Sequence, residues 1–297
     1  MAKGGNVIVE SWARTDTGRQ RATNEDCLYI DPDQELVLVL DGMGGHRAGE
    51  VASRMAMETI ASFYKRYSNA SDEKLDIFDD YDNTFTFQAN LLRQATFIAN
   101  RVVLEKSIQS EEYVGMGSTM TGMAIHDYTV SMINVGDTRM YLIRNGTIEQ
   151  ISKDHTLAED QVERGVMSRD EARESQLRHI LSSVIGVDPR IRIHMDELAI
   201  FPGDTFVLCT DGVTAVMQDQ EILEEILNGS PGPETLERII DRVNERGGPD
   251  NTTLALTVFH EDPEGEKEMV PIVELDASDP SVVHDVKQQE DVEDIDV

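Results

Sequence analysis

The spacing of apolar side chains divides the chain into helical and extended segments. Apolar residues recur every three or four positions over 48–67 and 87–107, which predicts two long amphipathic helices in succession. Two shorter helices are expected later, at 219–228 and 233–246. The last of these begins with a proline and stops before a pair of glycines, which are residues that favour those two ends of a helix.

Short runs rich in β-branched and aromatic residues predict strands around these helices. The runs lie at 27–30, 35–40, 118–125, 129–135, 139–144, 147–151, 204–210 and 251–259. Many links between them are short and polar, and the Asn145-Gly146 dipeptide is a strong signal for a two-residue hairpin. Short links imply antiparallel pairing. Because the first two helices follow one another instead of alternating with strands, the expected fold class is α+β, with antiparallel sheets covered by helices and not a doubly wound parallel sheet.

Three segments depart from this pattern. Residues 153–185 carry polar helical pieces without an evident sheet partner, which predicts a protruding subdomain. Residues 68–83 form an acidic stretch between the two long helices and are expected to be a loop or small insertion. Residues 261–297 hold fourteen Asp or Glu, two lysines and no aromatic residue, so we expect a disordered acidic tail after a folded domain of residues 1–260.

The composition restricts the possible functions. A formal net charge of −31 and a pI near 4.4 disfavour nucleic acid as a partner, because nucleic-acid binding depends on Lys and Arg at the phosphates. The apolar runs are far shorter than the roughly 20 residues of a membrane span, and the N-terminal segment lacks a secretory pattern. A cytoplasmic protein with no membrane attachment is therefore expected. Cys27 and Cys209 are expected to be buried hydrophobic residues and not disulfide or zinc ligands.

Aspartates recur at the ends of the predicted strands. Asp41 and Asp211 each follow a buried apolar run and precede a glycine, which lets a main-chain carbonyl approach a ligand closely. For either Asp-Gly pair alone, a simple turn is the more common explanation. Asp26, Asp137 and Asp250 stand at comparable places beside other strands, and five such residues are harder to attribute to turns.

A site built from carboxylates, without His or Cys, favours Mg²⁺ or Mn²⁺ over zinc or copper. Two such ions can convert a bridging water into hydroxide near neutral pH and can stabilise charge on a transferring phosphoryl group. The chain lacks the G-x-S-x-G and P-loop motifs of other hydrolase classes. These features favour hydrolysis by an activated water, without a covalent enzyme intermediate.

Six motifs occur in the order and approximate spacing of one known family. They are TDTGRQRATNED (15–26), DGMGGH (41–46), GMGST (115–119), VGDTR (135–139), TDGV (210–213) and GPDN (248–251). Over roughly residues 10–260 the chain resembles the type 2C, or PPM, family of protein phosphatases, in its bacterial branch. The resemblance implies a central antiparallel β-sandwich flanked by helices (α-β-β-α) and a metal-dependent protein serine/threonine phosphatase. The segment 153–185 corresponds to the flap of that family.

The resemblance also implies a set of metal ligands. The family residue that matches Asp41 bridges two metal ions, and the carbonyl that matches Gly42 helps to hold the second ion. The residues that match Asp211 and Asp250 bind the first ion, and Asp26 matches the acidic position that completes the binuclear site. The implied cofactors are two Mn²⁺ or Mg²⁺ ions.

Further roles follow by the same correspondence. Asp137, together with Asp211, matches a pair that binds a third, weaker metal ion. Arg21 matches the arginine that grips substrate phosphate, a task suited to a forked guanidinium, although a loop arginine is more often a surface residue. His46 matches a proposed general acid, and a capping or structural role is the alternative. Asn251 is interpreted as an orienting group for a metal-bound water or as ordinary turn chemistry.

His155 and His179, both in the flap segment, could be catalytic, but they are interpreted as ordinary polar helix residues. The implied partners are phosphorylated proteins, including a serine/threonine kinase and its substrates, with no nucleic acid and no membrane. A catalytically inactive PPM-fold scaffold or regulatory binding protein is the main alternative. Such a protein is expected to have lost metal aspartates or the phosphate-binding arginine, and all of them are present here. A metal-dependent nuclease is disfavoured by the acidic charge.

Overall fold

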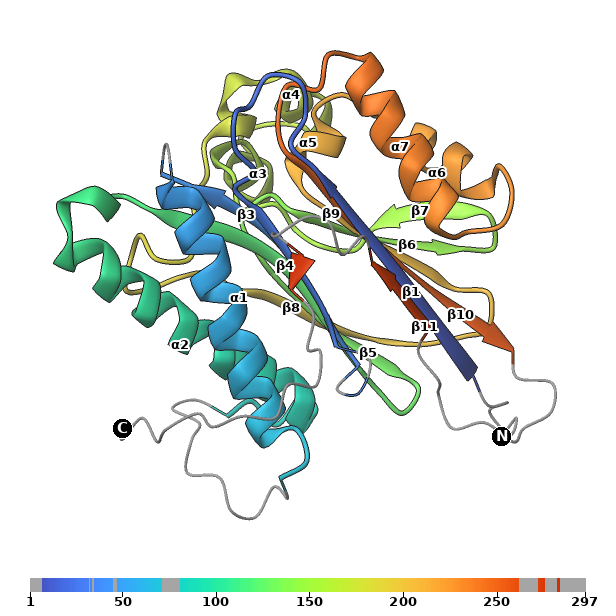
Figure 1. The fold of residues 1–297 in the computed structure, drawn as a ribbon, viewed down its shortest axis with the longest axis horizontal. Helices are drawn as coiled ribbons and strands as arrows, with labels where there is room; N and C mark the ends of the chain where they lie inside the picture. Colours follow the sequence, from blue (N-terminus) through green and yellow to red (C-terminus); the bar gives the residue numbers. More distant parts are fainter. Residues whose placement is uncertain are drawn as a thin grey trace.

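The structure is a computed structural model of the chain. It describes residues 7–31, 33, 35–44, 47–70 and 81–261, together with the backbone of 272–275 and 282–283. Two six-stranded sheets lie face to face, and helices cover the outer face of each (Figure 1). The architecture is therefore the α-β-β-α sandwich that the sequence and its resemblance predicted. Within these described ranges, no helix is long and apolar enough to cross a bilayer.

The strands form two sheets of mostly antiparallel pairs. The first sheet has the order β11-β1-β10-β9-β6-β7, and the second has the order β12-β2-β3-β4-β5-β8. The strands of the first sheet are β1 (Val7–Asp16), β6 (Arg139–Arg144), β7 (Thr147–Gln150), β9 (Thr205–Cys209), β10 (Thr252–Glu261) and β11 (Ile272–Leu275). Those of the second sheet are β2 (Asp26–Asp31), β3 (Leu36–Met43), β4 (Gly117–His126), β5 (Thr129–Val135), β8 (His194–Ala199) and β12 (Val282–Val283).

The helices fall into two groups, with shorter helical pieces at one end of the sandwich (Figure 1). The helices are α1 (Ala48–Tyr67), α2 (Phe87–Gln109), α3 (Leu157–Glu163), α4 (Arg169–Glu174), α5 (Asp211–Thr214), α6 (Asp219–Leu227) and α7 (Pro233–Glu245), with 3-10 turns η2 (Glu111–Tyr113) and η3 (Gln176–His179). Helices α1 and α2 pack on the second sheet, while α5, α6 and α7 pack on the first.

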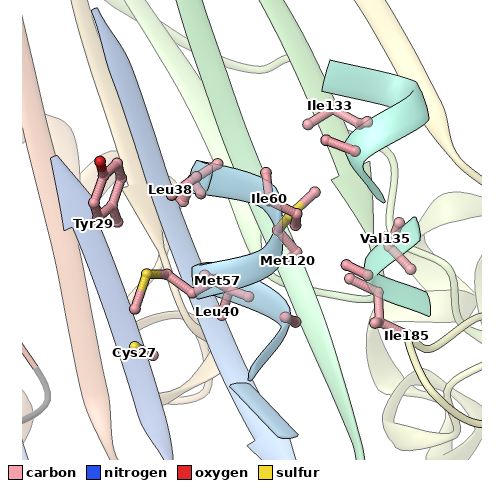
Figure 2. Close-up of a cluster of buried hydrophobic side chains, with 14 of the residues drawn as sticks. Cys27, Tyr29, Leu38, Leu40, Met57, Ile60, Met120, Ile133, Val135 and Ile185 are labelled. Carbon is pink, nitrogen blue, oxygen red and sulfur yellow. The ribbon is translucent and has the colours of Figure 1, made fainter. Parts of the chain in front are cut away.

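Strand β3 is buried on both faces, which explains why its apolar run is continuous instead of alternating. Val37 and Val39 point between the two sheets, where they join a core that includes Phe206 and Phe259. The intervening Leu36, Leu38 and Leu40 point to the other face, against α1. Successive strand residues face opposite sides, so a strand buried on both sides must be apolar throughout. Figure 2 shows the α1 side of this arrangement, with Leu38 and Leu40 beside Met57 and Ile60.

All eight predicted strands and all four predicted helices are present, with ends that differ by a few residues. Two strands of the domain before the tail, β1 and β8, were not predicted. Strand β1 mixes buried and partly exposed residues in the sequence VIVESWARTD, and β8, in the sequence HMDELA, is only partly buried. Both carry polar or charged residues within a short apolar pattern, which weakens the strand signal.

The predictions for the three segments outside the regular pattern have different outcomes. Residues 153–185 contain the predicted helical pieces, but Ser118 of β4 and Ile185 form an isolated antiparallel bridge, so this segment is tied to the second sheet. Most of the predicted insertion at 68–83 lies outside the described residues. In the tail, β11 pairs parallel with β1 and β12 pairs parallel with β2, which differs from the predicted disorder at those two segments. Each of these tail strands covers backbone groups that an edge strand leaves unpaired. The rest of 261–297 lies outside the described residues.

Candidate metal and phosphate site

Two carboxylates lie opposite each other at the end of the second sheet. Asp26 opens β2 and Asp41 lies near the end of β3, and the two residues are direct partners in the antiparallel pairing. Directly opposed residues project from the same face of a sheet, so this register places two like charges side by side. Like charges in that position are unfavourable unless a cation or a proton compensates them.

Three further aspartates reach this end of the sandwich from other segments. Asp211 follows β9 and begins α5, and Asp250 lies just before β10, the antiparallel neighbour of β9. Asp137 lies in the short link between β5 and β6, where the chain passes from the second sheet to the first. Figure 1 shows α3, α4 and α5 at the same end of the molecule.

Asp41 interacts electrostatically with the other four carboxylates. Burial raises the pKa of Asp41 well above its usual value, and the charges of Asp26, Asp211, Asp137 and Asp250 raise it further. We call these five residues the aspartate cluster. Asp26 is 1% exposed and is the most deeply buried member, whereas the other four are partly exposed.

The remaining shifts have the same physical origin. Burial raises the pKa of Asp26 to about 7, although hydrogen bonds from Thr253 and Thr210 oppose the shift. Burial, followed by the charge of Asp211, raises the pKa of Asp137 to about 7. The pKa of Asp211 is itself raised, first by burial and then by the charge of a neighbouring carboxylate. The positively charged side chains of the protein therefore do not neutralise the carboxylates at this end of the sandwich.

The donor set fits divalent cations that prefer oxygen ligands. Among the described residues, Asp26 Oδ1 and Asp211 Oδ1 are buried with no hydrogen-bond partner. The other oxygen of Asp26 accepts a hydrogen bond from Thr210 Oγ1 at 3.0 Å, which fixes the orientation of the carboxylate. Within the described residues, no group of three or more His, Cys, Asp or Glu side chains is arranged so that it could hold a metal ion as it stands. The fit to Mg²⁺ or Mn²⁺ thus rests on the accumulated charge, the unpaired oxygens and the chemistry of the donors.

Gly42 is required for packing at the end of β3. A Cβ atom at this position would lie 2.1 Å from the carbonyl oxygen of Gly49 in α1 and 2.6 Å from that of Glu25. The Gly42 amide also donates a hydrogen bond to Glu25 O at 3.1 Å. Any side chain here would push α1 away from the aspartate cluster. The proposed role of the Gly42 carbonyl as a metal ligand stays a prediction.

Arg21 lies beside the cluster, not on a remote surface. Its Nη2 atom is 2.6 Å from Asp250 Oδ2, and half of its side chain is exposed. A partly exposed guanidinium next to carboxylates can contact an anion from solvent while it remains close to the cluster. The role of Arg21 in binding substrate phosphate stays a prediction.

His155 differs from its interpretation as an ordinary polar helix residue, whereas His179 is an exposed polar residue of a 3-10 turn. His155 precedes α3, is 7% exposed, and accepts a hydrogen bond from the Gly136 amide at its Nδ1 atom (3.2 Å). Burial lowers the pKa of His155 to about 4, so it is neutral at physiological pH and anchors the link that carries Asp137. His179 lies in η3, and its charge lowers the pKa of Asp211, which places it near the cluster. His46, the predicted general acid, lies outside the described residues.

Asn251 has contacts that neither interpretation from the sequence included. Its side-chain amide donates two hydrogen bonds to backbone carbonyls of the β1–β2 loop and accepts one from a backbone amide. Both of its amide hydrogens are therefore used within the protein. Sequence spacing did not reveal this role, because the partners are main-chain atoms more than 220 positions away.

Comparison with known proteins agrees with this geometry. The family model "Protein phosphatase 2C" matches residues 16–256. The serine/threonine phosphatase stp of Listeria welshimeri is 31% identical over 248 residues, which cover 82% of this chain and 93% of that protein. The serine/threonine protein phosphatase PstP of Mycobacterium tuberculosis is 31% identical over 251 residues, which cover 84% of this chain and 45% of that protein.

Solved structures give the same result. Stp1 from Staphylococcus aureus superposes with a TM-score of 0.72 at 27% identity, covering 87% of this chain and 97% of that one. The catalytic domain of PstP in complex with two manganese ions has a TM-score of 0.70 at 28% identity, covering 86% and 100%. Fold and sequence agree over the same region, and the chain belongs to the protein phosphatase 2C, or PPM, family, with bacterial phosphatases among its relatives.

Proposed function

We propose that this protein is a metal-dependent phosphatase that hydrolyses phosphoserine and phosphothreonine in other proteins. The convergence of the aspartate cluster is the observation that carries the proposal. Five carboxylates from separate segments share one end of the sandwich, and burial and mutual repulsion raise the pKa of four of them. Such an arrangement is costly for folding alone, and divalent cations relieve the cost.

Each carboxylate has a role in this proposal. Asp41, near the end of β3, would be shared by two cations, with Asp211 and Asp250 as further ligands of the first cation and Asp26 completing the site. Asp137 and Asp211 would hold a third, weaker cation. When bound, Mn²⁺ or Mg²⁺ supplies Lewis acidity that lowers the pKa of a water and neutralises charge on the phosphoryl oxygens. Thr210 keeps the Asp26 carboxylate oriented through its hydrogen bond.

The remaining residues act on the substrate. Arg21 binds the phosphate through its guanidinium, which is held near the cluster by its ion pair with Asp250. The Gly42 carbonyl would supply a further oxygen ligand, and His46 would donate a proton to the departing seryl or threonyl oxygen. No side chain is required as a nucleophile.

Hydrolysis of a small aryl phosphate by the purified full-length protein tests the proposal. We expect turnover with Mn²⁺ or Mg²⁺. We expect no turnover after chelation of the metal or in the variant Asp211→Asn. Asp241→Asn, which changes an exposed aspartate on α7, is the matched control and should retain full activity. A wild-type protein that is inert with either ion but binds a protein partner would favour the inactive scaffold instead.

The physiological substrates follow from the same proposal. We infer that they are phosphorylated proteins, including a serine/threonine kinase and its targets. Comparison of phosphoproteomes between cells with and without the gene should show phosphoserine and phosphothreonine sites that rise in its absence. An unchanged phosphoproteome would remove the proposed cellular role.

A further inference from the structure

Asn251 has a side chain whose hydrogen-bonding capacity is directed entirely at one loop. It is 4% exposed and directly follows Asp250. Its Nδ2 atom donates to the carbonyl oxygens of Thr17 and Thr23, both at 2.9 Å, and its Oδ1 atom accepts from the Glu25 amide at 2.8 Å. Both amide hydrogens are used, so the side chain joins three separate points of backbone.

These points lie near the two ends of the loop of residues 17–25, which connects β1 to β2 and which we call the Arg21 loop. Arg21 lies between the anchored ends. The amides of Arg19 and Gln20 both donate to Gly248 O, at 2.8 and 3.2 Å. The loop is thus fastened to the turn before β10 at its middle as well as at its ends.

Gly18 shows how closely the loop approaches that turn. Its φ is +77°, and a Cβ atom there would lie 2.2 Å from the carbonyl oxygen of Asp250. Backbone contact of this kind fixes the loop relative to Asp250. The long Arg21 side chain extends from the loop toward the Asp250 carboxylate. The Arg21 guanidinium then reaches Asp250 Oδ2 at 2.6 Å.

We propose that Asn251 is a positioning residue for substrate phosphate, because it fixes the Arg21 loop against the turn that carries Asp250. This inference rests on the proposed function and on the phosphate-binding role of Arg21. Asn251 contacts neither phosphate nor metal itself. Its loss would remove the hydrogen bonds that it makes with two carbonyls and one amide and would let the loop, and Arg21 with it, move away from the phosphate position.

A double-mutant cycle separates this role from general stabilisation. The cycle compares four proteins: wild type, Asn251→Ala, Arg21→Ala and the double variant. Each is measured by aryl phosphate kinetics with Mn²⁺ and by calorimetric titration with inorganic phosphate. Asn251→Ala should raise KM and the phosphate Kd about tenfold, while kcat and Mn²⁺ affinity change less than about twofold. In the Arg21→Ala background the same change should have almost no further effect, because both substitutions remove one interaction.

Asn90 offers a matched structural control. It is 1% exposed, its Nδ2 atom donates to Asp82 O and Thr86 O at 2.9 Å, and its Oδ1 atom accepts from the Asp82 amide at 2.9 Å. Asn90→Ala should lower Tm as Asn251→Ala does but leave KM and phosphate affinity unchanged. Hydrogen exchange should accelerate in residues 17–25 only in the Asn251 variant. If the alanine variant does not fold, Asn251→Ser, whose hydroxyl offers one shorter hydrogen-bonding group, replaces it.

The possible outcomes are distinct. Multiplicative effects of the two substitutions, or a loss confined to kcat or to Mn²⁺ affinity, would overturn the positioning role while the phosphatase stands. A wild-type protein without metal-dependent hydrolysis would instead overturn the proposed function. The phosphate titration still decides the role of Asn251 in that case, because it needs no turnover, and absence of phosphate binding by wild type would overturn that role too.

Discussion

Buried carboxylates that lack counter-ions oppose folding, and the aspartate cluster concentrates this conflict in one place. Each raised pKa means that the folded chain prefers the protonated form of that side chain. A protein that keeps such a cluster sacrifices stability for a function that needs negative charge. The same reasoning separates the cluster from ordinary turn aspartates, which are solvated and cost little.

Asp41→Asn should therefore stabilise the metal-free protein while it abolishes hydrolysis. At pH 8 in a chelator, we expect the free energy of unfolding to rise by about 1–2 kcal/mol, because one of the repelling charges is removed. Urea denaturation measures this change, with Asp241→Asn on the exposed face of α7 as the control. A lower stability of Asp41→Asn under these conditions would contradict the account of the cluster.

The pH dependence of metal binding follows from the same shifts. The pKa values of Asp26 and Asp137 rise from 3.8 to about 7 on folding, so the folded chain holds protons that the unfolded chain releases in this range. The stability contributed by these groups is complete below about pH 4 and is lost as the pH rises through about 7. Mn²⁺ displaces those protons, so its affinity and its effect on Tm should increase with pH.

Thermal unfolding with and without Mn²⁺ at about pH 5.5 and about pH 7.5 checks this expectation, and a larger metal-induced Tm shift at the higher pH is predicted. His155 acts in the opposite sense, because its lowered pKa makes folding less favourable as the pH falls from 6.5 to about 4. Comparing metal-loaded with metal-free protein at each pH cancels that contribution. Equal Tm shifts at both pH values would mean that binding displaces no protons.

At the scale of elements, periodic segments were predictable and mixed segments were not. Helix α1 begins and ends at the residues that its apolar spacing indicated, and β5 and β6 also match. Strands β1 and β8 were missed because their polar residues interrupt the apolar pattern. The aspartates at strand ends were identified from sequence, since that position depends only on local pattern. The anchoring roles of His155 and Asn251 depend on tertiary contacts with backbone atoms, which residue spacing does not encode.

The packing of α1 on β3 gives a test at this scale. Ile60 is fully buried between α1 and the second sheet, beside Met57 and Leu38 (Figure 2). Ile60→Ala should lower the free energy of unfolding by about 3 kcal/mol, because it leaves a cavity in a close-packed core. Glu58→Ala, on the exposed face of the same helix, should change it by less than about 0.5 kcal/mol. Urea titrations that give similar values for the two variants would show that α1 does not pack on this sheet.

At the scale of the whole molecule, the two sheets share one functional end and each receives a strand from the tail. The aspartate cluster takes Asp26 and Asp41 from the second sheet, and Asp211 and Asp250 from segments that flank strands of the first. Relative movement of the sheets would therefore change the spacing of the carboxylates. The core between the sheets, with the Phe206–Phe259 ring contact at 5.6 Å, resists such movement.

The tail strands lead to a prediction about self-association. Without β11 and β12, strands β1 and β2 would each present an unpaired edge, which is a template for pairing between molecules. Truncation after His260 also removes fourteen acidic residues and two lysines, so repulsion between copies falls. Size-exclusion chromatography with light scattering should show concentration-dependent association of the truncated protein, whereas kcat on an aryl phosphate stays the same. A truncated protein that remains monomeric with an unchanged Tm would show that the tail leaves these edges uncovered in solution. A rise in turnover would instead indicate that the tail contacts the rim of the site.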